Sequence, residues 1–99
     1  MSEVMAGTGI SLRISDGVRN AVVTYDSHVL VGEVIRNCCV ELGLTPTTVD
    51  GVTTNVQVLK TSGDGKIRGE KLDVNVATAR ATLALANFRN GDALIFNAT

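Results

Sequence analysis

Apolar and polar residues alternate along the early part of the chain. From residue 10 to residue 15, Ile, Leu and Ile alternate with Ser, Arg and Ser, and this two-residue period predicts a strand with one face toward water. Asp16-Gly17 follows, a dipeptide that favours tight hairpin turns, and residues 21–25 form a second run of β-forming residues. We therefore predict a β-hairpin over residues 10–25.

After residue 26 the apolar spacing changes from two residues to three and four, which is the period of one helix face. Asp26 and Ser27 can cap the start of a helix, while Gly43 suits the left-handed position after its end and Pro46 prevents continuation. We predict one helix over about residues 29–42. Its apolar face consists of Val31, Val34, Ile35, Cys38 and Leu42.

The middle of the chain alternates between turn residues and short apolar runs. Residues 45–54 are rich in Thr and predict a loop with a turn at Asp50-Gly51, although their Thr-Val alternation also suits a minor strand. Residues 56–59 predict a third strand, and residues 61–65 predict a flexible turn into a short strand at Lys66-Ile67-Arg68. These two strands are expected to form a second hairpin.

The last third of the chain predicts a short helical segment and one more strand. Residues 78–85 are rich in Ala and Leu, which favours a short helix or a 3₁₀ turn. A turn at Asn90-Gly91-Asp92 leads into residues 93–96, whose successive apolar side chains predict a central strand covered on both faces. Residues 1–8 lack any pattern, so we expect a flexible N-terminal tail followed by one domain at residues 9–99.

Composition limits what this domain can do. The chain has 99 residues and a net charge of −1, which suffices for one core but lacks the basic excess that nucleic-acid binding requires. No apolar run suits a membrane span or a signal peptide, and Cys38 and Cys39 are adjacent, which disfavours an ordinary disulfide. We therefore predict a cytoplasmic protein in a reducing compartment, with no nucleic acid as a partner and no insertion into a membrane.

The order of hairpin, helix, hairpin, helical turn and buried last strand resembles the ubiquitin-like β-grasp family. The hairpin at residues 10–25, the helix face from Val31 to Leu42, and Thr82-Leu83 followed by the Asn90-Gly91-Asp92 turn carry the resemblance, because ubiquitin-like domains place a Gly-Asp turn before their final strand. The resemblance implies an α+β fold, with a mixed sheet of four to five strands and one main helix packed on one face. It also implies a non-enzymatic protein that acts through protein–protein interaction.

Three branches of this family imply different roles. Ubiquitin-type modifiers and sulfur carriers end in Gly-Gly, whereas no Gly follows Gly91 in this sequence. A bacterial ubiquitin-like modifier would therefore need a C-terminus processed at Asn97, Ala98 or Thr99, and its partners would be activating or conjugating enzymes. The alternative is a YukD-like accessory protein of type VII secretion, which lacks Gly-Gly and binds secretion components noncovalently. A sulfur carrier fits the sequence least.

No residues form a recognisable catalytic, cofactor or metal site. Cys38 and Cys39 lie in the latter part of the predicted helix, where the helix dipole disfavours a thiolate, so we expect Cys38 to pack in the core and Cys39 at its edge. His28, the sole histidine, has no partner motif, and the glycines of residues 63–65 do not match a phosphate-binding loop. We predict no enzyme activity, no cofactor and no metal.

The candidate sites are therefore surfaces. Alternation with the core positions predicts a sheet face, open to partners, that carries Ser11, Arg13, Gln57, Lys60 and Arg68. An unpaired strand edge would offer a second surface, through which copies of the chain could pair into homo-oligomers.

Overall fold

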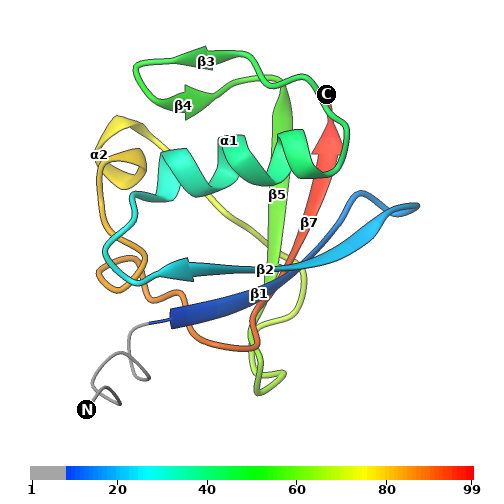
Figure 1. Ribbon diagram of the computed structural model, residues 1–99, viewed down its shortest axis with the longest axis vertical. Coiled ribbons are helices and arrows are strands. Elements are labelled where there is room, and N and C mark those ends of the chain that lie inside the picture. Colours follow the sequence, from blue (N-terminus) through cyan, green and yellow to red (C-terminus); the bar gives the residue numbers. More distant parts are fainter. Residues whose placement is uncertain (1–8) are drawn as a thin grey trace.

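The structure is a computed structural model that describes residues 9–99, and the predicted tail at residues 1–8 lies outside the described residues. One main helix crosses a twisted sheet, with a small separate hairpin and a short helix beside it (Figure 1). Neither helix in this part of the chain is long and apolar enough to cross a membrane. The elements are β1 (Gly9–Ser15), β2 (Asn20–Asp26), α1 (Val31–Glu41), β3 (Thr48–Val49), β4 (Val52–Thr53), β5 (Val56–Thr61), β6 (Glu70–Lys71), α2 (Val76–Ala79) and β7 (Ala93–Ala98).

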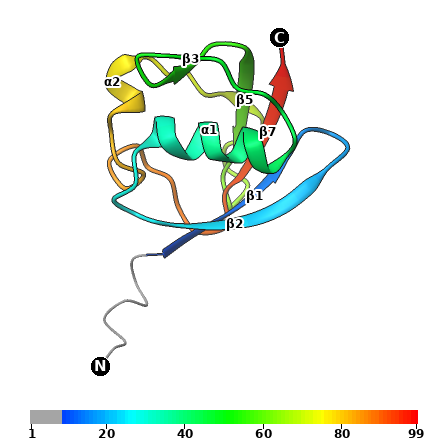
Figure 2. The ribbon, with the colours of Figure 1, turned by 45° about the horizontal axis from the view of Figure 1, so that its top comes forward.

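Five strands form the main sheet in the order β2-β1-β7-β5-β6. β1 and β7 are parallel and the other neighbours are antiparallel, so the sheet is mixed as predicted. β7 lies between β1 and β5, which places the last strand of the sequence beside the first. Together with α1, which lies on one side of the sheet, this arrangement confirms the predicted α+β architecture (Figure 2).

β1 and β2 form the predicted hairpin, and every residue of one strand has a partner in the other. The Asp16 carboxylate accepts hydrogen bonds from the backbone N–H groups of Val18 at 2.9 Å and Arg19 at 2.6 Å, and Gly17 has a φ of 97°. These bonds hold the pKa of Asp16 below its usual value of 3.8. The carboxylate and the glycine together explain why the chain reverses here.

α1 spans Val31–Glu41, slightly less than predicted, and its start differs from the prediction. The residue before the helix is Leu30, and no side chain caps it, so the predicted cap at residues 26–27 is wrong. The Val31 N–H instead donates to the carbonyl of Ala81 at 2.9 Å. A distant segment of the chain therefore satisfies a donor that we expected a local side chain to satisfy.

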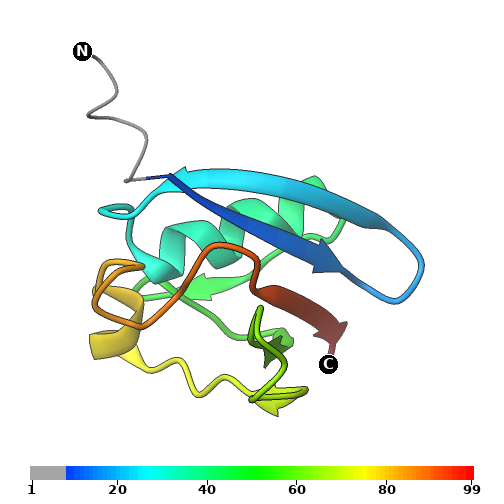
Figure 3. The same ribbon diagram turned by 90° about the horizontal axis from the view of Figure 1, so that it is seen from below.

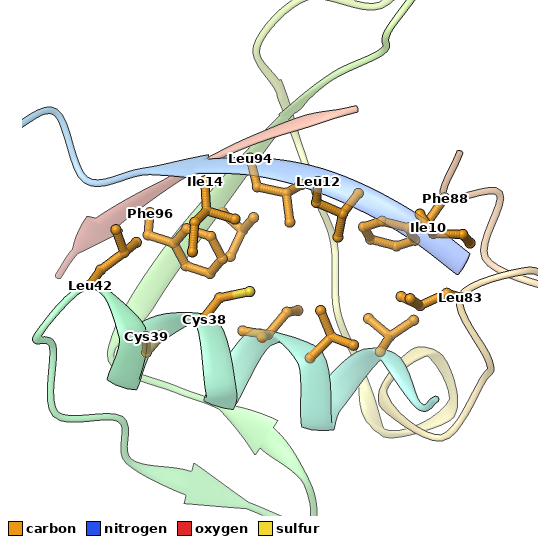
Figure 4. Close-up of a cluster of buried hydrophobic side chains, with 14 residues drawn as sticks. Ile10, Leu12, Ile14, Cys38, Cys39, Leu42, Leu83, Phe88, Leu94 and Phe96 are labelled. Carbon is orange, nitrogen blue, oxygen red and sulfur yellow. The ribbon is translucent and has the colours of Figure 1, made fainter. Parts of the chain in front are cut away.

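The core lies between α1 and the strands. Figure 4 shows side chains of β1 and β7 pointing toward α1, with Cys38 directed back toward the sheet. Both cysteines are fully buried, so Cys39 lies within the core and not at its edge as expected. The buried apolar cluster consists of Ile10, Leu12, Ile14, Val31, Val34, Ile35, Cys38, Cys39, Leu42, Val58, Leu83, Phe88, Leu94 and Phe96.

Residues 45–54 contain both the predicted turn and the minor strands. Asp50 and Gly51 have left-handed φ angles of 52° and 83°, and they connect β3 to β4 in a small hairpin outside the main sheet. Gly32 of α1 lies so close to this turn that a Cβ atom there would collide with the Gly51 carbonyl oxygen. The close approach of the hairpin to α1 therefore requires glycine at position 32.

The second hairpin forms with a different strand from the one predicted. β5 spans Val56–Thr61, but it pairs with Glu70–Lys71 and not with Lys66-Ile67-Arg68. The Ser62 hydroxyl and the Asp64 carboxylate each accept a hydrogen bond at 3.0 Å from a backbone N–H within the predicted strand. Because these side chains bind the donors that a strand would use, the segment forms a loop.

The second helical segment begins earlier than predicted. α2 spans Val76–Ala79, and the Asn75 side chain caps its start. Residues 80–87 form bends and turns instead of continuing the helix, because the N–H groups of residues 83 and 84 donate to carbonyls of residues 27–29. Pairing with a distant segment therefore ends the helix.

β7 is central as predicted, but only one of its faces is covered. Leu94 and Phe96 are each 1% exposed on the α1 side, whereas Ile95 between them is 39% exposed. The successive apolar residues therefore do not reflect burial on both sides. Ile95 lies on the face of the sheet opposite α1.

Candidate interaction surfaces

The face of the sheet opposite α1 is built from alternate residues of four strands. These residues form the open face: Ser11, Arg13, Ser15, Val22, Thr24, Gln57, Leu59, Thr61, Ala93, Ile95 and Asn97. The set contains one cation, Arg13. By the same alternation Asn20 and Asp26, at the two ends of β2, also face this side, and Asp26 is the one acidic residue that these four strands place there. Most members of the set are polar, so the apolar side chains stand out on this face.

Two aliphatic side chains are exposed on the open face. Val22 of β2 is 69% exposed and Ile95 of β7 is 39% exposed. Together with Arg13 and Ala93 they line a hollow of about 710 Å³. Exposed aliphatic side chains around a hollow are typical of surfaces that bind another protein. The alternation of the sequence did not predict either residue as part of a binding face. The successive apolar residues of β2 and β7 were the pattern that could have indicated them.

The structure places the predicted sheet-face residues on different surfaces. Arg13 and Gln57 lie on the open face, in β1 and β5. Lys60 is also in β5, but it pairs with the buried residue Leu94, so its side chain lies on the α1 side. Arg68 lies in the loop between β5 and β6, and its Nε donates to a carbonyl of that loop at 3.2 Å. Lys60 and Arg68 therefore do not join the open face.

Lys60 belongs to a polar cluster on the α1 side. Its Nζ lies 3.5 Å from Oδ2 of Asp92 and 4.4 Å from the ring centroid of Phe88, and it donates to the carbonyl of Asn87 at 3.0 Å. Asp92 is 2% exposed, and its carboxylate also accepts two backbone hydrogen bonds at 2.9 Å, one from each adjoining loop. The cluster joins β5 to the turn before β7, which is a structural role.

The two cysteines are in an environment that suppresses their reactivity. Burial raises the pKa of the Cys38 thiol to about 12, and burial likewise raises the pKa of Cys39. Burial, and then the neighbouring Cys38, raise the pKa of Tyr25 to about 12. A nucleophilic cysteine needs a lowered pKa, so these thiols suit packing and not catalysis.

His28 makes only local contacts. Its Nδ1 lies 2.9 Å from Oδ1 of Asp26, and its backbone N–H donates to the same oxygen at 2.8 Å. These bonds hold the pKa of Asp26 below its usual value of 3.8. Within residues 9–99, no three His, Cys, Asp or Glu side chains come together in a way that could hold a metal ion.

The residues that a modifier would use as its processed C-terminus are part of the sheet. Asn97 and Ala98 pair with β5, and the N–H of Thr99 donates to the carbonyl of Asn55 at 3.0 Å. An enzyme that acts on an extended tail would first have to separate these residues from β5.

Solved structures of three other proteins are similar to the chain along most of its length. A ubiquitin-like domain from tubulin-binding cofactor B is 16% identical, with a TM-score of 0.67 over 93% of this chain and 91% of that one. The C-terminal ubiquitin-like domain of mouse tubulin-specific chaperone E is 14% identical, with a TM-score of 0.66 over 100% and 95% of the two chains. A structure from work on molecular mimicry of SUMO in DNA repair is 13% identical, with a TM-score of 0.58 over 90% of each chain.

No protein-family model matches the sequence, and none of the curated proteins matches it. The similarity therefore lies in the architecture: a mixed sheet with the last strand at its centre and one helix across one face. The chain has the ubiquitin-like β-grasp fold.

Proposed function

We propose that this protein is a non-enzymatic interaction module that binds a protein partner through its open face. The observation that carries the proposal is the exposure of Val22 and Ile95 beside Arg13, around a hollow of about 710 Å³. Burial of such side chains against a partner removes apolar surface from water and stabilises the complex. The fold supports this role by analogy, since it presents one sheet face that no helix covers.

Arg13 defines the charge that the partner should carry. Among residues 9–99 no carboxylate forms an ion pair with Arg13, and Asp26, at the end of β2, contacts His28 instead. A partner would therefore present aliphatic side chains to the hollow and a carboxylate to the Arg13 guanidinium. A charge-assisted hydrogen bond beside apolar contacts favours one orientation of the partner.

Partner capture with matched variants tests the proposal. Ile95→Lys places a second cation in the apolar part of the open face, whereas Leu85→Lys makes the same change at a side chain that is 78% exposed elsewhere on the molecule. Proteins retained from a host extract are identified by mass spectrometry, and a candidate is then titrated as a purified protein. We expect Ile95→Lys to lose the partner and Leu85→Lys to keep it.

Two results would contradict this function. Equal affinity of the wild type and Ile95→Lys for every purified partner would show that the open face is not used. A partner that binds the Arg13→Glu variant more tightly than the wild type would show that the proposed charge is wrong. Thermal unfolding of each variant checks that it is folded.

The finer proposal is a bacterial ubiquitin-like modifier with a processed C-terminus, and the alternative is a YukD-like protein that binds secretion components noncovalently. Pairing of Asn97 and Ala98 with β5 favours the noncovalent role. Incubation with ATP and the products of neighbouring genes, followed by intact mass measurement, separates them. An adenylate, an ester or tail loss supports the modifier, a thiocarboxylate supports a sulfur carrier, and an unchanged mass within a stable complex supports noncovalent binding.

Cell fractionation tests the predicted cytoplasmic location.

A further inference from the structure

We propose that two copies of this chain pair through the edge of β2, as antiparallel strands related by a twofold axis at Val23. β2 is the outermost strand of the sheet, next to β1 (Figure 3). This pairing goes beyond the function proposed above, because it uses the backbone edge of β2, although Val22 and Thr24 also carry side chains of the open face. Side chains of the open face would contact a foreign partner, whereas backbone groups of β2 would bind the second copy.

The hydrogen-bond pattern of the hairpin identifies the backbone groups that β2 directs outward. The Asp16 N–H donates to the carbonyl of Arg19 at 3.2 Å, so these two residues are a hydrogen-bonded pair. In an antiparallel hairpin, hydrogen-bonded and non-hydrogen-bonded pairs alternate along the strands, so the odd-numbered residues of β2 are the ones that bond to β1. The even-numbered residues therefore point their N–H and C=O groups away from β1. Within residues 9–99 no strand pairs with these groups, and only the Asp26 carbonyl has another partner, the N–H of Val29. The outward residues are Asn20, Val22, Thr24 and Asp26.

The two edges of the sheet differ in how well they are protected. β6, at the far edge, is only Glu70–Lys71, and both residues are charged and exposed. β2 has seven residues in regular register, with no bulge, no Pro and no Lys, and its one charged residue is Asp26 at the end. Native proteins protect edges with short strands, charges, Pro or bulges. β6 has this protection and β2 lacks it.

The sequence of β2 is complementary to itself in the antiparallel direction. With Val23 on the axis, Asn20 lies opposite Asp26 of the second copy, and Val22 lies opposite Thr24 of the second copy. An amide thus faces a carboxylate, and two β-branched side chains face each other. No like charges are opposed, and all four outward residues of each copy find partners.

The inner side of the same pairing is also compatible with packing. Ala21, Val23 and Tyr25 are partly buried against the core on the α1 side. In the proposed register Ala21 lies opposite Tyr25 of the second copy, so a small side chain faces a large one, and Val23 faces its own equivalent. A shift by two residues would leave an outward residue of each strand without a strand partner. The register at Val23 is therefore the one that uses the whole strand.

A proline at an outward position tests the pairing. Thr24→Pro removes an N–H that points away from β1, so it blocks the edge without removing a bond of the hairpin. Thr24→Val is the matched control, because it also removes the Thr24 hydroxyl that lies 2.9 Å from the Ser11 hydroxyl but keeps the N–H. Sedimentation equilibrium over a wide concentration range gives the dimer dissociation constant. We expect Thr24→Pro to raise this constant about tenfold or more relative to Thr24→Val.

Disulfide trapping tests the register. In the proposed dimer a cysteine at Val23→Cys faces its own equivalent and crosslinks under mild oxidation, whereas Asn20→Cys, at the end of the strand, does not. A wild-type chain that is monomeric at every concentration overturns the proposal. This holds even if the monomer binds an added extended peptide, because the proposed occupant of the edge is a second copy. Equal dimerisation of Thr24→Pro and Thr24→Val, or crosslinking of Asn20→Cys but not of Val23→Cys, also overturns it.

Discussion

The two faces of the five-stranded sheet come from the same strands, yet their side chains meet opposite environments. In β7, Leu94 is 1% exposed beneath α1, and its neighbour Ile95 is 39% exposed on the open face. Successive residues of a strand point to opposite faces, so one step along the backbone separates the core from the candidate binding surface. Stability and binding should therefore be separable by substitutions at adjacent positions.

The largest expected difference between the faces is in β7 itself. Leu94→Ala should lower the free energy of unfolding by about 2–4 kcal/mol, because it leaves a cavity in a single small core. Ile95→Ala should lower it by less than about 1 kcal/mol, because the side chain is already partly in water. Urea unfolding of both variants measures the difference. Equal losses would show that the open face is also buried.

The next largest effect should separate Lys60 from Gln57 in β5. Lys60→Met removes the ammonium beside the buried carboxylate of Asp92 and should cost about 1–3 kcal/mol of unfolding free energy. Gln57→Met, on the open face of the same strand, should change it by less than about 0.5 kcal/mol. Chemical denaturation of the two variants measures both changes. If Lys60→Met leaves the free energy of unfolding unchanged, the Lys60 side chain lies in solvent and not beside Asp92.

A smaller effect should appear at alkaline pH, because the α1 face holds a buried thiol. In the folded chain the pKa of Cys38 is about 12, whereas the unfolded thiol has its ordinary value of 9.0. The folded state keeps a proton that the unfolded state releases, so this contribution is complete below pH 9 and is lost as pH rises from 9 toward 12. We expect a loss of about 1 kcal/mol between about pH 8 and pH 10, measured by urea unfolding. Cys38→Ala should show a smaller loss, and an equal loss in this variant would assign the effect to other groups.

The smallest change in stability should come from the open face. Val22→Thr keeps a β-branched shape at a side chain that is 69% exposed, so the free energy of unfolding should change by less than about 0.5 kcal/mol. The melting temperature, which measures this, should therefore stay close to that of the wild type. The same variant should weaken binding of an open-face partner, because it puts a hydroxyl at an apolar contact. A large drop in stability with unchanged binding would reverse the roles assigned to the two faces.

Sequence periodicity predicted those parts of the fold whose structure is fixed locally. The alternation at residues 10–14 and the Asp16-Gly17 turn suffice for the first hairpin, and the spacing from Val31 to Leu42 suffices for α1. The errors lie where distant or side-chain groups satisfy the backbone. Val31 bonds to Ala81 and not to a local cap, and loop side chains bind the N–H groups of the strand predicted at residues 66–68.

The candidate site was harder to predict because apolar residues in a strand have two uses. The run at residues 93–96 suits a strand covered on both faces, and it equally suits a strand with one face in the core and an apolar side chain, Ile95, on the exposed face. Lys60 was predictable from parity, since Gln57 and Lys60 are three positions apart and cannot share a face of a regular strand. Its pairing with Asp92 was not predictable, because it depends on how the turn before β7 folds against β5.

The parallel pairing of β1 with β7 has a consequence for the synthesis of the protein. The N–H of Ser11 donates to the side chain of Asn90, a contact that spans 79 positions of the sequence. β1, β2 and α1 leave the ribosome long before β7, and β1 then lacks one of its two neighbouring strands. Folding driven by such long-range contacts is slow and waits for the missing strand. The nascent chain should therefore stay sensitive to proteases and open to chaperones until residues 93–98 have emerged.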